Sequence, residues 1–248
     1  MIKVKTEKQM EGMREAGRLA ARLLKACGDA VVPGVTTLDI DAIARETCEK
    51  MGVESAFLNY HGYPGCICIS VNDEVIHGIP GPRVIHNGDV VSLDVGVRYN
   101  GFNGDNAKTV MVGVTDPAIV ELVDKTSEAL MAGVEAVAPG RHLSDVSAAV
   151  EKVARSANLG VVREFVGHGI GTQLHEDPMV PNFGRPGRGP VLKEGMVICI
   201  EPMLNRGSAE VKVLDDGWTV VTRDGSYAAH FEHMVAVVPG GHEILSPR

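Results

Sequence analysis

The two halves of this sequence carry the same succession of motifs, and this repeat constrains the fold more than any other feature. A Pro-Gly pair precedes an amphipathic segment in each half, at 33–34 and again at 139–140. An apolar run that ends in a carboxylate follows in each half, at 88–94 and at 195–201. Because the motifs recur in the same order, the sequence predicts two related halves.

Each half is predicted to contain two helices followed by a hairpin. Thr6 and Gln9 form a capping-box pattern, and Asp116-Pro117 is a typical helix start. Apolar residues recur at helical spacing over about 6–27, 37–51, 116–137 and 144–160, with Ser144 as the last cap and Gly160 as the last stop. We therefore expect one α+β domain over 1–248, with halves of about 1–115 and 116–248 and helices on one face of an antiparallel sheet.

The composition excludes several classes of protein. The net charge is −8 without a long run of one sign, so the surface does not suit nucleic acid as a substrate. No apolar run reaches the length of a membrane span, and the polar start from Met1 to Arg14 lacks the apolar core of a signal peptide. We expect a cytoplasmic protein that does not bind membranes.

The cysteines are odd in number, and most lie in apolar runs, which favours reduced and buried thiols. They are Cys27, Cys48, Cys66, Cys68 and Cys199. Cys66 and Cys68 form a C-x-C pair, but no second pair completes a zinc site, so both are interpreted as residues of a strand wall.

Four carboxylates occupy strand-like apolar segments, where a charge is rarely found unless it is paired or bound to a metal. They are Asp94, Asp105, Glu201 and Glu232. The strong hairpin signal Asn100-Gly101 separates the first two. With a two-residue turn, Asp105 falls opposite Gly96, which shares a face with Asp94 because the strand period is two. Carboxylates held this close repel unless cations lie between them, so the pattern favours two divalent ions. Taken singly, each carboxylate is also compatible with an exposed edge charge.

Three histidines stand beside turns. His168 lies between glycines in Gly167-His168-Gly169 and is the candidate imidazole ligand. His77 and His175 are candidates for proton donation or substrate contact. A single histidine near glycines is more often an ordinary turn residue, so only the histidines and carboxylates together indicate a functional site.

Several short motifs closely resemble those of the type I methionine aminopeptidases, and the resemblance extends over nearly the whole chain. They are Tyr60-His61-Gly62-Tyr63-Pro64, Ser70-Val71-Asn72, His77-Gly78-Ile79-Pro80, Gly167-His168-Gly169-Ile170-Gly171, His175-Glu176-Asp177-Pro178, Ile200-Glu201-Pro202-Met203 and Phe231-Glu232-His233. The resemblance implies the pita-bread fold, whose two halves are related by pseudo-twofold symmetry. It also implies removal of the initiator methionine before a small residue, by two-metal hydroxide attack on the first peptide bond.

Carried over residue by residue, the resemblance assigns roles to the site. Asp94 would bind one metal, and His168 and Glu201 the other, while Asp105 and Glu232 would bridge both. Glu201 would also handle the proton, and His77 and His175 would contact the scissile amide and the tetrahedral intermediate. The metal would be Co, Mn, Fe, Zn or Ni, among which these ligands do not discriminate.

The methionine side chain would lie in an apolar pocket, which suits a thioether. The matching positions are Tyr60, Tyr63, Cys68 and Trp218, although Trp218 is also compatible with plain core packing. Asn103 stands where histidine is usual, Leu174 where an aromatic residue is common, and Lys108 where the pattern varies. These departures put pocket shape and rate in question, and they leave the ligands intact.

The implied partners are nascent chains with an N-terminal methionine after deformylation, since a free amine must bind a metal. The ribosome is a further candidate partner, and a monomer is expected. An X-Pro aminopeptidase of the same fold and a non-enzymatic peptide-binding module are the competing interpretations. A plain structural domain would leave the strand carboxylates without explanation.

Overall fold

The computed structural model describes residues 2–247, and the helices that follow Thr6 and Asp116 begin at the predicted caps. The helices are α1 (Glu7–Asp29), α2 (Thr37–Met51), the short 3-10 helix η1 (Tyr60–Gly62), α3 (Pro117–Glu135) and α4 (Leu143–Ser156). The predicted capping box of Thr6 and Gln9 starts α1, and Asp116 caps α3 through the backbone N–H of Ala118.

The predicted ends of the fourth helix are wrong. His142 is the N-cap of α4, because the Asp145 carboxylate accepts its backbone N–H, while the hydroxyl of Ser144 accepts the N–H of Arg188 instead. The helix ends at Ser156, before the predicted Gly160. Asn158 takes up the left-handed backbone conformation, with φ of 53°, that a glycine was expected to provide.

A nine-stranded antiparallel sheet forms the centre of the molecule, in the order β1-β4-β5-β14-β9-β7-β8, with β2 added to β4 and β15 to β14. Its strands are β1 (Glu54–Ser55), β2 (Cys68–Val71), β4 (Val90–Tyr99), β5 (Phe102–Met111), β7 (Gly167–Gly169), β8 (Glu176–Val180), β9 (Val197–Ile200), β14 (Glu232–Val238) and β15 (Gly241–Ile244). Two small sheets contain β3 (Glu74–Ile76), β6 (Gly160–Val161), β10 (Met203–Asn205), β11 (Val211–Val213), β12 (Val220–Thr222) and β13 (Ala228–His230).

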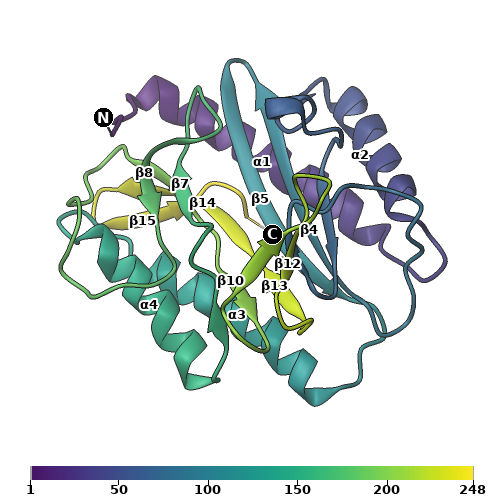
Figure 1. The fold of residues 1–248 in the computed structure, drawn as a ribbon. Coiled ribbons are helices and arrows are strands. Elements are labelled where there is room, and N and C mark those ends of the chain that lie inside the picture. The colour runs from purple at the N-terminus through teal and green to yellow at the C-terminus, as the bar shows by residue number, and fades with distance from the viewer. Residues whose placement is uncertain (1, 248) are drawn as a thin grey trace.

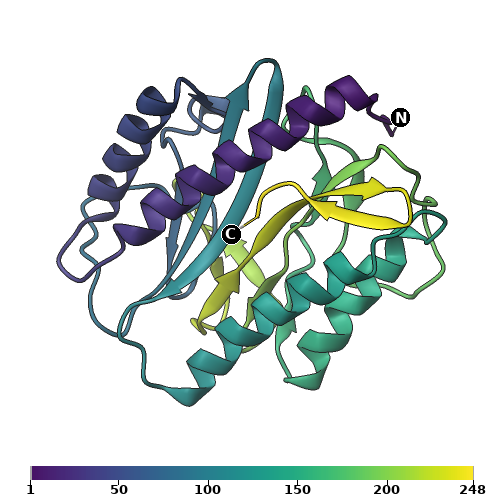
Figure 2. The same ribbon diagram turned by 180° about the vertical axis from the view of Figure 1, so that it is seen from behind.

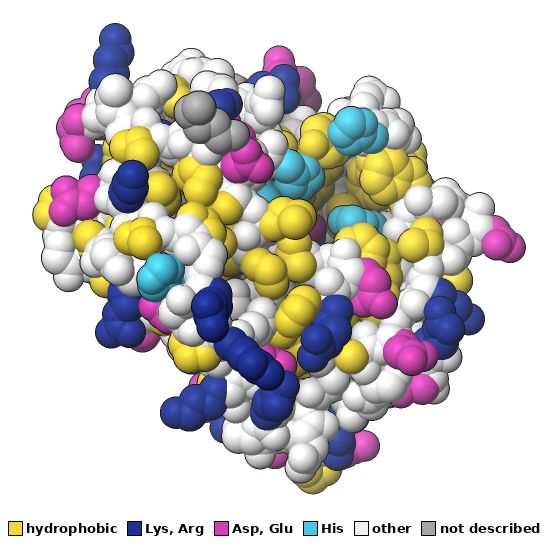
Figure 3. Space-filling model, turned by 60° about the vertical axis from the view of Figure 1, so that its left-hand side comes forward, with side chains coloured by type: hydrophobic (Ala, Val, Ile, Leu, Met, Phe, Trp, Pro, Cys, Tyr) yellow, Lys and Arg dark blue, Asp and Glu magenta, His cyan; other side chains and the backbone are white. Residues whose placement is uncertain are grey.

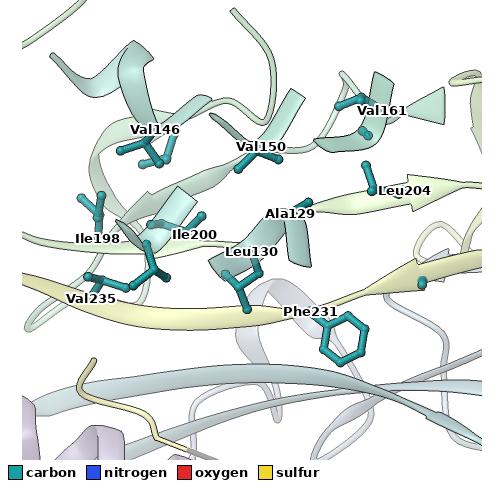
Figure 4. Close-up of a cluster of buried hydrophobic side chains, with 14 of the residues drawn as sticks. Ala129, Leu130, Val146, Val150, Val161, Ile198, Ile200, Leu204, Phe231 and Val235 are labelled. Atoms are coloured by element: carbon teal, nitrogen blue, oxygen red, sulfur yellow. The ribbon is translucent and has the colours of Figure 1, made fainter. Parts of the chain in front are cut away.

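The helices lie across one face of the curled sheet, and the two halves are built alike (Figures 1 and 2). In the first half, α1 and α2 pack over β4, around a core that includes Leu23, Ile40 and Leu93. In the second half, α3 and α4 pack over β9 and β14, where their apolar side chains gather as Figure 4 shows. The expected antiparallel sheet with helices on one face and a repeated half is confirmed. The extent of a single catalytic domain over 1–248 stays a prediction. Within the described part of the chain, no helix combines the length and the apolarity needed to cross a bilayer.

Side chains alternate along β5, so neighbouring residues face opposite sides of the sheet. Gly104 faces α1 so closely that an added Cβ would lie 2.1 Å from the backbone oxygen of Ala16, whereas Asp105 faces the opposite side of the sheet. A glycine at 104 therefore lets the first helix lie directly on the strand that carries Asp105.

We expect Gly104→Ala to lower the free energy of unfolding by about 1–3 kcal/mol, because the helix backbone must move to accept a methyl group. The matched control is Gly241→Ala in β15, where an added Cβ meets no atom within 4 Å and the change should stay within about 0.5 kcal/mol. Urea denaturation of both variants checks this, and equal stabilities would contradict the close approach of α1.

Candidate active site

One cavity of about 310 Å³ opens on the sheet face opposite the helices, and all the residues predicted for the site line it. They are Tyr60, Tyr63, Cys68, His77, Asp94, Asp105, His168, His175, Glu201, Trp218 and Glu232. Figure 3 shows the hollow, with histidine and hydrophobic side chains gathered around it. The chain therefore brings together residues that are spread over most of its length.

The carboxylates converge because their strands are neighbours in the sheet. Asn100 and Gly101 form the predicted two-residue turn with φ of 48° and 81°, and Asp105 lies opposite Gly96 as the register predicted. Both Asp94 and Glu232 lie opposite Ala107, on either side of β5, so these two acids share one face of the sheet with Asp105. Glu201 directly follows β9, which is the next strand beyond β14.

The donor set fits divalent cations. Donor atoms of Asp105, His168, Cys199 and Glu232 all lie within 4.8 Å of one another. Among residues 2–247, the buried Oδ1 atoms of Asp94 and Asp105 have no hydrogen-bond partner. A buried carboxylate oxygen without a donor is unfavourable by itself, and a cation would satisfy it.

Burial and mutual repulsion raise the pKa of these acids. Loss of water around the carboxyl raises the pKa of Asp94 to about 7. Burial, followed by the charges of Glu232 and Asp94, raises the pKa of Asp105 well above its usual range. Burial also raises the pKa of Glu201, with Asp94 and Asp105 adding repulsion. The acids thus hold protons unless positive charge replaces them.

His168 presents one ring nitrogen to this cluster. Its Nδ1 lies 3.0 Å from the carbonyl oxygen of Gly169, which can only accept, so Nδ1 carries the proton. Nε2 then has a lone pair, 3.6 Å from Glu201 Oε1 and 3.7 Å from Asp105 Oδ2. Burial, with the nearby His175, lowers the pKa of His168 to about 3, so the ring is neutral and able to bind a cation.

The other two histidines flank the cluster. His175 lies at the cavity mouth, its ring 4.3 Å from that of His168, and its Nδ1 is 2.8 Å from the hydroxyl of Tyr60. Burial and the nearby His61 lower its pKa. His77 directly follows β3 in a left-handed conformation with φ of 59°, and burial lowers its pKa to about 4. Both imidazoles are therefore neutral near pH 7.

An apolar wall lies beside the acids. The Tyr63 hydroxyl donates to the carbonyl of Gly78 over 2.8 Å, and the Trp218 ring meets the Tyr63 ring edge to face at 5.1 Å. Cys68 pairs directly with Asp94 across β2 and β4, which places a thiol next to the carboxylates. Trp218 is only half-buried and lines the cavity, so it is not plain core packing. All five cysteines are free and buried, as expected.

The three departures from the motif pattern lie in different places. Asn103 is buried and donates both its backbone N–H and its side-chain amide to the carbonyl of Gly171. Leu174 is buried in the cavity wall, just before His175. Lys108 is remote from the cavity, since its ammonium lies against Gly28 of α1.

Sequence reasoning missed three residues of the cavity region. Cys199 shares a face of β9 with Glu201 by the period of two, a signal that was available. Phe57 and His61 line the cavity from the segment around η1, where no periodic pattern predicts direction. Phe57 also occupies the space above Gly96, where an added Cβ would lie 2.4 Å from its ring.

Comparison with known proteins is consistent with this geometry. The model of metallopeptidase family M24 matches residues 11–239. The chain is 47% identical to methionine aminopeptidase of Clostridium perfringens and 45% identical to methionine aminopeptidase 1 of Bacillus subtilis, in both cases over 99% of each chain. The crystal structure of methionine aminopeptidase from Thermotoga maritima matches with a TM-score of 0.98 and 44% identity, covering 100% of both chains. Prolidase from Pyrococcus furiosus, at 23% identity and a TM-score of 0.80, is similar in fold alone.

Proposed function

Because this chain belongs to the methionine aminopeptidases of metallopeptidase family M24, we propose that it removes the initiator methionine from nascent proteins when the next residue is small. One observation carries the proposal for these residues: a single cavity joins an acidic, cation-fitting cluster to an apolar wall of sulfur and aromatic groups. The first suits peptide-bond hydrolysis, and the second suits a methionine side chain.

Five residues are proposed to hold two divalent cations. Asp94 would hold one and His168 with Glu201 the other, while Asp105 and Glu232 would bridge both. The cations would be Co, Mn, Fe, Zn or Ni, because carboxylates with one imidazole accept any of them. When bound, they would supply a nucleophile at neutral pH and positive charge for the developing oxyanion.

The proton chemistry is assigned to Glu201, His77 and His175. Glu201 would take the proton at its carboxylate, whose raised pKa favours holding one. If the Tyr60 hydroxyl donates to Nδ1 of His175, the imidazole proton lies on Nε2 and can be donated to the substrate. His77, neutral and facing Trp218 at 6.3 Å between ring centres, would contact the scissile amide from the pocket side.

The substrate is proposed to enter with its methionine side chain against Tyr60, Tyr63, Cys68 and Trp218. A free N-terminal amine would bind beside the acids, so removal of the formyl group must come first. We further propose that the enzyme acts in the cytoplasm as a monomer, on nascent chains at the ribosome, since deformylated substrates arise there.

Substrate selectivity tests the assignment. Among Met-Ala-Ser, Met-Lys-Ser, Leu-Ala-Ser and N-formyl-Met-Ala-Ser, we expect rapid turnover of the first alone. The branched leucine side chain does not fit the methionine pocket, and the formyl group removes the free amine. The long lysine side chain in second position meets the cavity wall. The measurement is kcat/KM for each peptide with the metal-loaded enzyme. Equal cleavage of Leu-Ala-Ser or of the formylated peptide would show that the assignment is wrong.

The competing interpretations make different predictions in the same assay. An X-Pro aminopeptidase would prefer peptides with proline in second position, and X-Pro aminopeptidase from Thermotoga maritima is similar to this chain in fold only, at 22% identity. A peptide-binding module would bind Met-Ala-Ser without turnover. Metal content measured on the same sample separates the module from the enzyme.

A further inference from the structure

Residues 3–5 lie against the loop that carries His175, far from them in sequence (Figure 1). The backbone N–H of Lys5 donates to the carbonyl of Gly195 over 2.8 Å. The fit is close, because an added Cβ at Gly195 would lie 2.7 Å from Cγ1 of Val4. This contact directs the side chains of Lys3 and Lys5 toward Glu176, the residue that follows His175.

The Glu176 carboxylate lies inside the turn formed by residues 171–175. It accepts the backbone N–H of Gln173 over 3.3 Å, and its Oε1 would lie only 2.7 Å from a Cβ at Gly171. On the other side of the turn, Asn103 donates twice to the Gly171 carbonyl, over 2.9 and 3.0 Å. The turn is thus held between an amide on β5 and a carboxylate that fills its interior.

Two lysines neutralise this carboxylate, and they differ in exposure. Lys5 Nζ lies 3.0 Å from Oε2, with side-chain exposures of 7% for Lys5 and 3% for Glu176. Lys3 Nζ lies 2.9 Å from Oε1, but its side chain is 53% exposed. An exposed pair contributes little, whereas a buried carboxylate that loses its partner is strongly destabilised in place. Lys5 is therefore the lysine on which the position of Glu176 depends.

We propose that Lys5 is a positioning residue for His175. Its ammonium holds the Glu176 carboxylate within the 171–175 turn, and the turn in turn holds the imidazole against Tyr60 and at the cavity mouth. The inference deepens the proposed function and rests on it, since it takes His175 to contact the substrate. The N-terminal segment thereby sets the geometry of the active site without touching the substrate.

The test compares Lys5→Met with Lys8→Met, a control at an exposed lysine on the first turn of α1. Methionine keeps most of the aliphatic stem and removes the charge. We expect Lys5→Met to lower kcat on Met-Ala-Ser about tenfold. A misplacement of roughly 1 Å costs about 100-fold, and a smaller displacement of His175 costs less. KM and metal content should stay near those of the unaltered enzyme, Lys8→Met should be unchanged, and Lys5→Arg should restore most of the loss.

A double variant shows whether the effect passes through His175. In a His175→Ala background, Lys5→Met should cause no further loss of kcat, because the group it positions is gone. Glu176→Gln, which keeps the side-chain volume and removes the ion pair, should give the same loss and the same dependence on His175. If thermal melting shows that Lys5→Met does not fold, Glu176→Gln alone tests the positioning role.

The outcomes separate the two proposals. Three results would each overturn the positioning role while the function stands. They are an unchanged kcat in both Lys5→Met and Glu176→Gln, a loss of kcat from Lys5→Met that is as large in the His175→Ala background as in the unaltered enzyme, and a loss of metal. Full activity of His175→Ala itself would instead remove the proposed role of His175, and the positioning inference with it.

Discussion

Exhaustive removal of divalent cations from the purified protein is expected to abolish peptide hydrolysis, and adding back Mn, Co or Fe should restore it. The reason is the cluster of acids on one face of the sheet, two of which have buried oxygens without a hydrogen-bond donor among residues 2–247. Without cations these groups hold protons and cannot activate water. Met-Ala-Ser turnover, measured together with metal content by mass spectrometry, checks this. Full activity in verified metal-free protein would contradict the assignment of a metal-dependent reaction.

The same experiment has a stability readout that depends on pH. In the metal-free protein the folded pKa of Asp94 is raised to about 7, and those of Asp105 and Glu201 are also raised. A raised folded pKa contributes stability that is present below the unfolded pKa and is lost as pH rises through the folded pKa. Metal-free protein therefore loses the Asp94 contribution progressively between about pH 4 and about pH 7, whereas bound cations replace the protons.

The gap in Tm between metal-loaded and metal-free protein should accordingly widen as the pH rises. With metal well above its dissociation constant, a gap of roughly 5–10 °C is expected at about pH 8, and a smaller one at about pH 6. Comparing the two forms at each pH cancels the titration of groups outside the cluster. A gap that narrows with pH would contradict proton–metal exchange at these acids.

The second large effect distinguishes His168 from His175, whose rings lie 4.3 Å apart. His168→Ala should lose metal and activity together, because it removes the Nε2 lone pair that faces Asp105 and Glu201. His175→Ala should keep near-normal metal content and fold yet lose roughly 100- to 1,000-fold in kcat, the usual effect of removing one donor to a developing oxyanion. KM should change less than kcat.

Metal analysis and steady-state kinetics on both variants decide the assignment. Tyr60→Phe is a useful companion, because it removes only the hydroxyl that lies 2.8 Å from Nδ1 of His175. It should lower kcat less than His175→Ala and leave metal content unchanged. Loss of metal in His175→Ala with retention in His168→Ala would reverse the two roles.

The sequence predicted the site better than it predicted some boundaries, and the reason is physical. The period of two along a strand fixes which face a side chain takes, so Asp94 and Asp105 could be placed together from the Asn100-Gly101 turn alone. That Glu232 would join them could not be derived in this way, because pairing between β5 and β14 joins distant segments. The resemblance supplied it instead.

The errors and omissions have local causes. Ser144 is a good capping residue by type, but tertiary contact with Arg188 engages its hydroxyl, and His142 begins α4 instead. Phe57 and His61 lie around η1, where backbone direction follows no repeat. The ion pair of Lys5 with Glu176 joins the N-terminal segment to the second half of the chain and leaves no signal in a single sequence.

The two halves pack alike but contribute different residues to the cavity, and neither half supplies all of them. Asp94 and Asp105 come from the first half, whereas His168, Glu201 and Glu232 come from the second. The reaction space therefore lies at the seam between the halves and needs both of them in one fold. A nearly symmetric scaffold carries asymmetric chemistry, with the two aspartates on one side of the seam and the imidazole on the other.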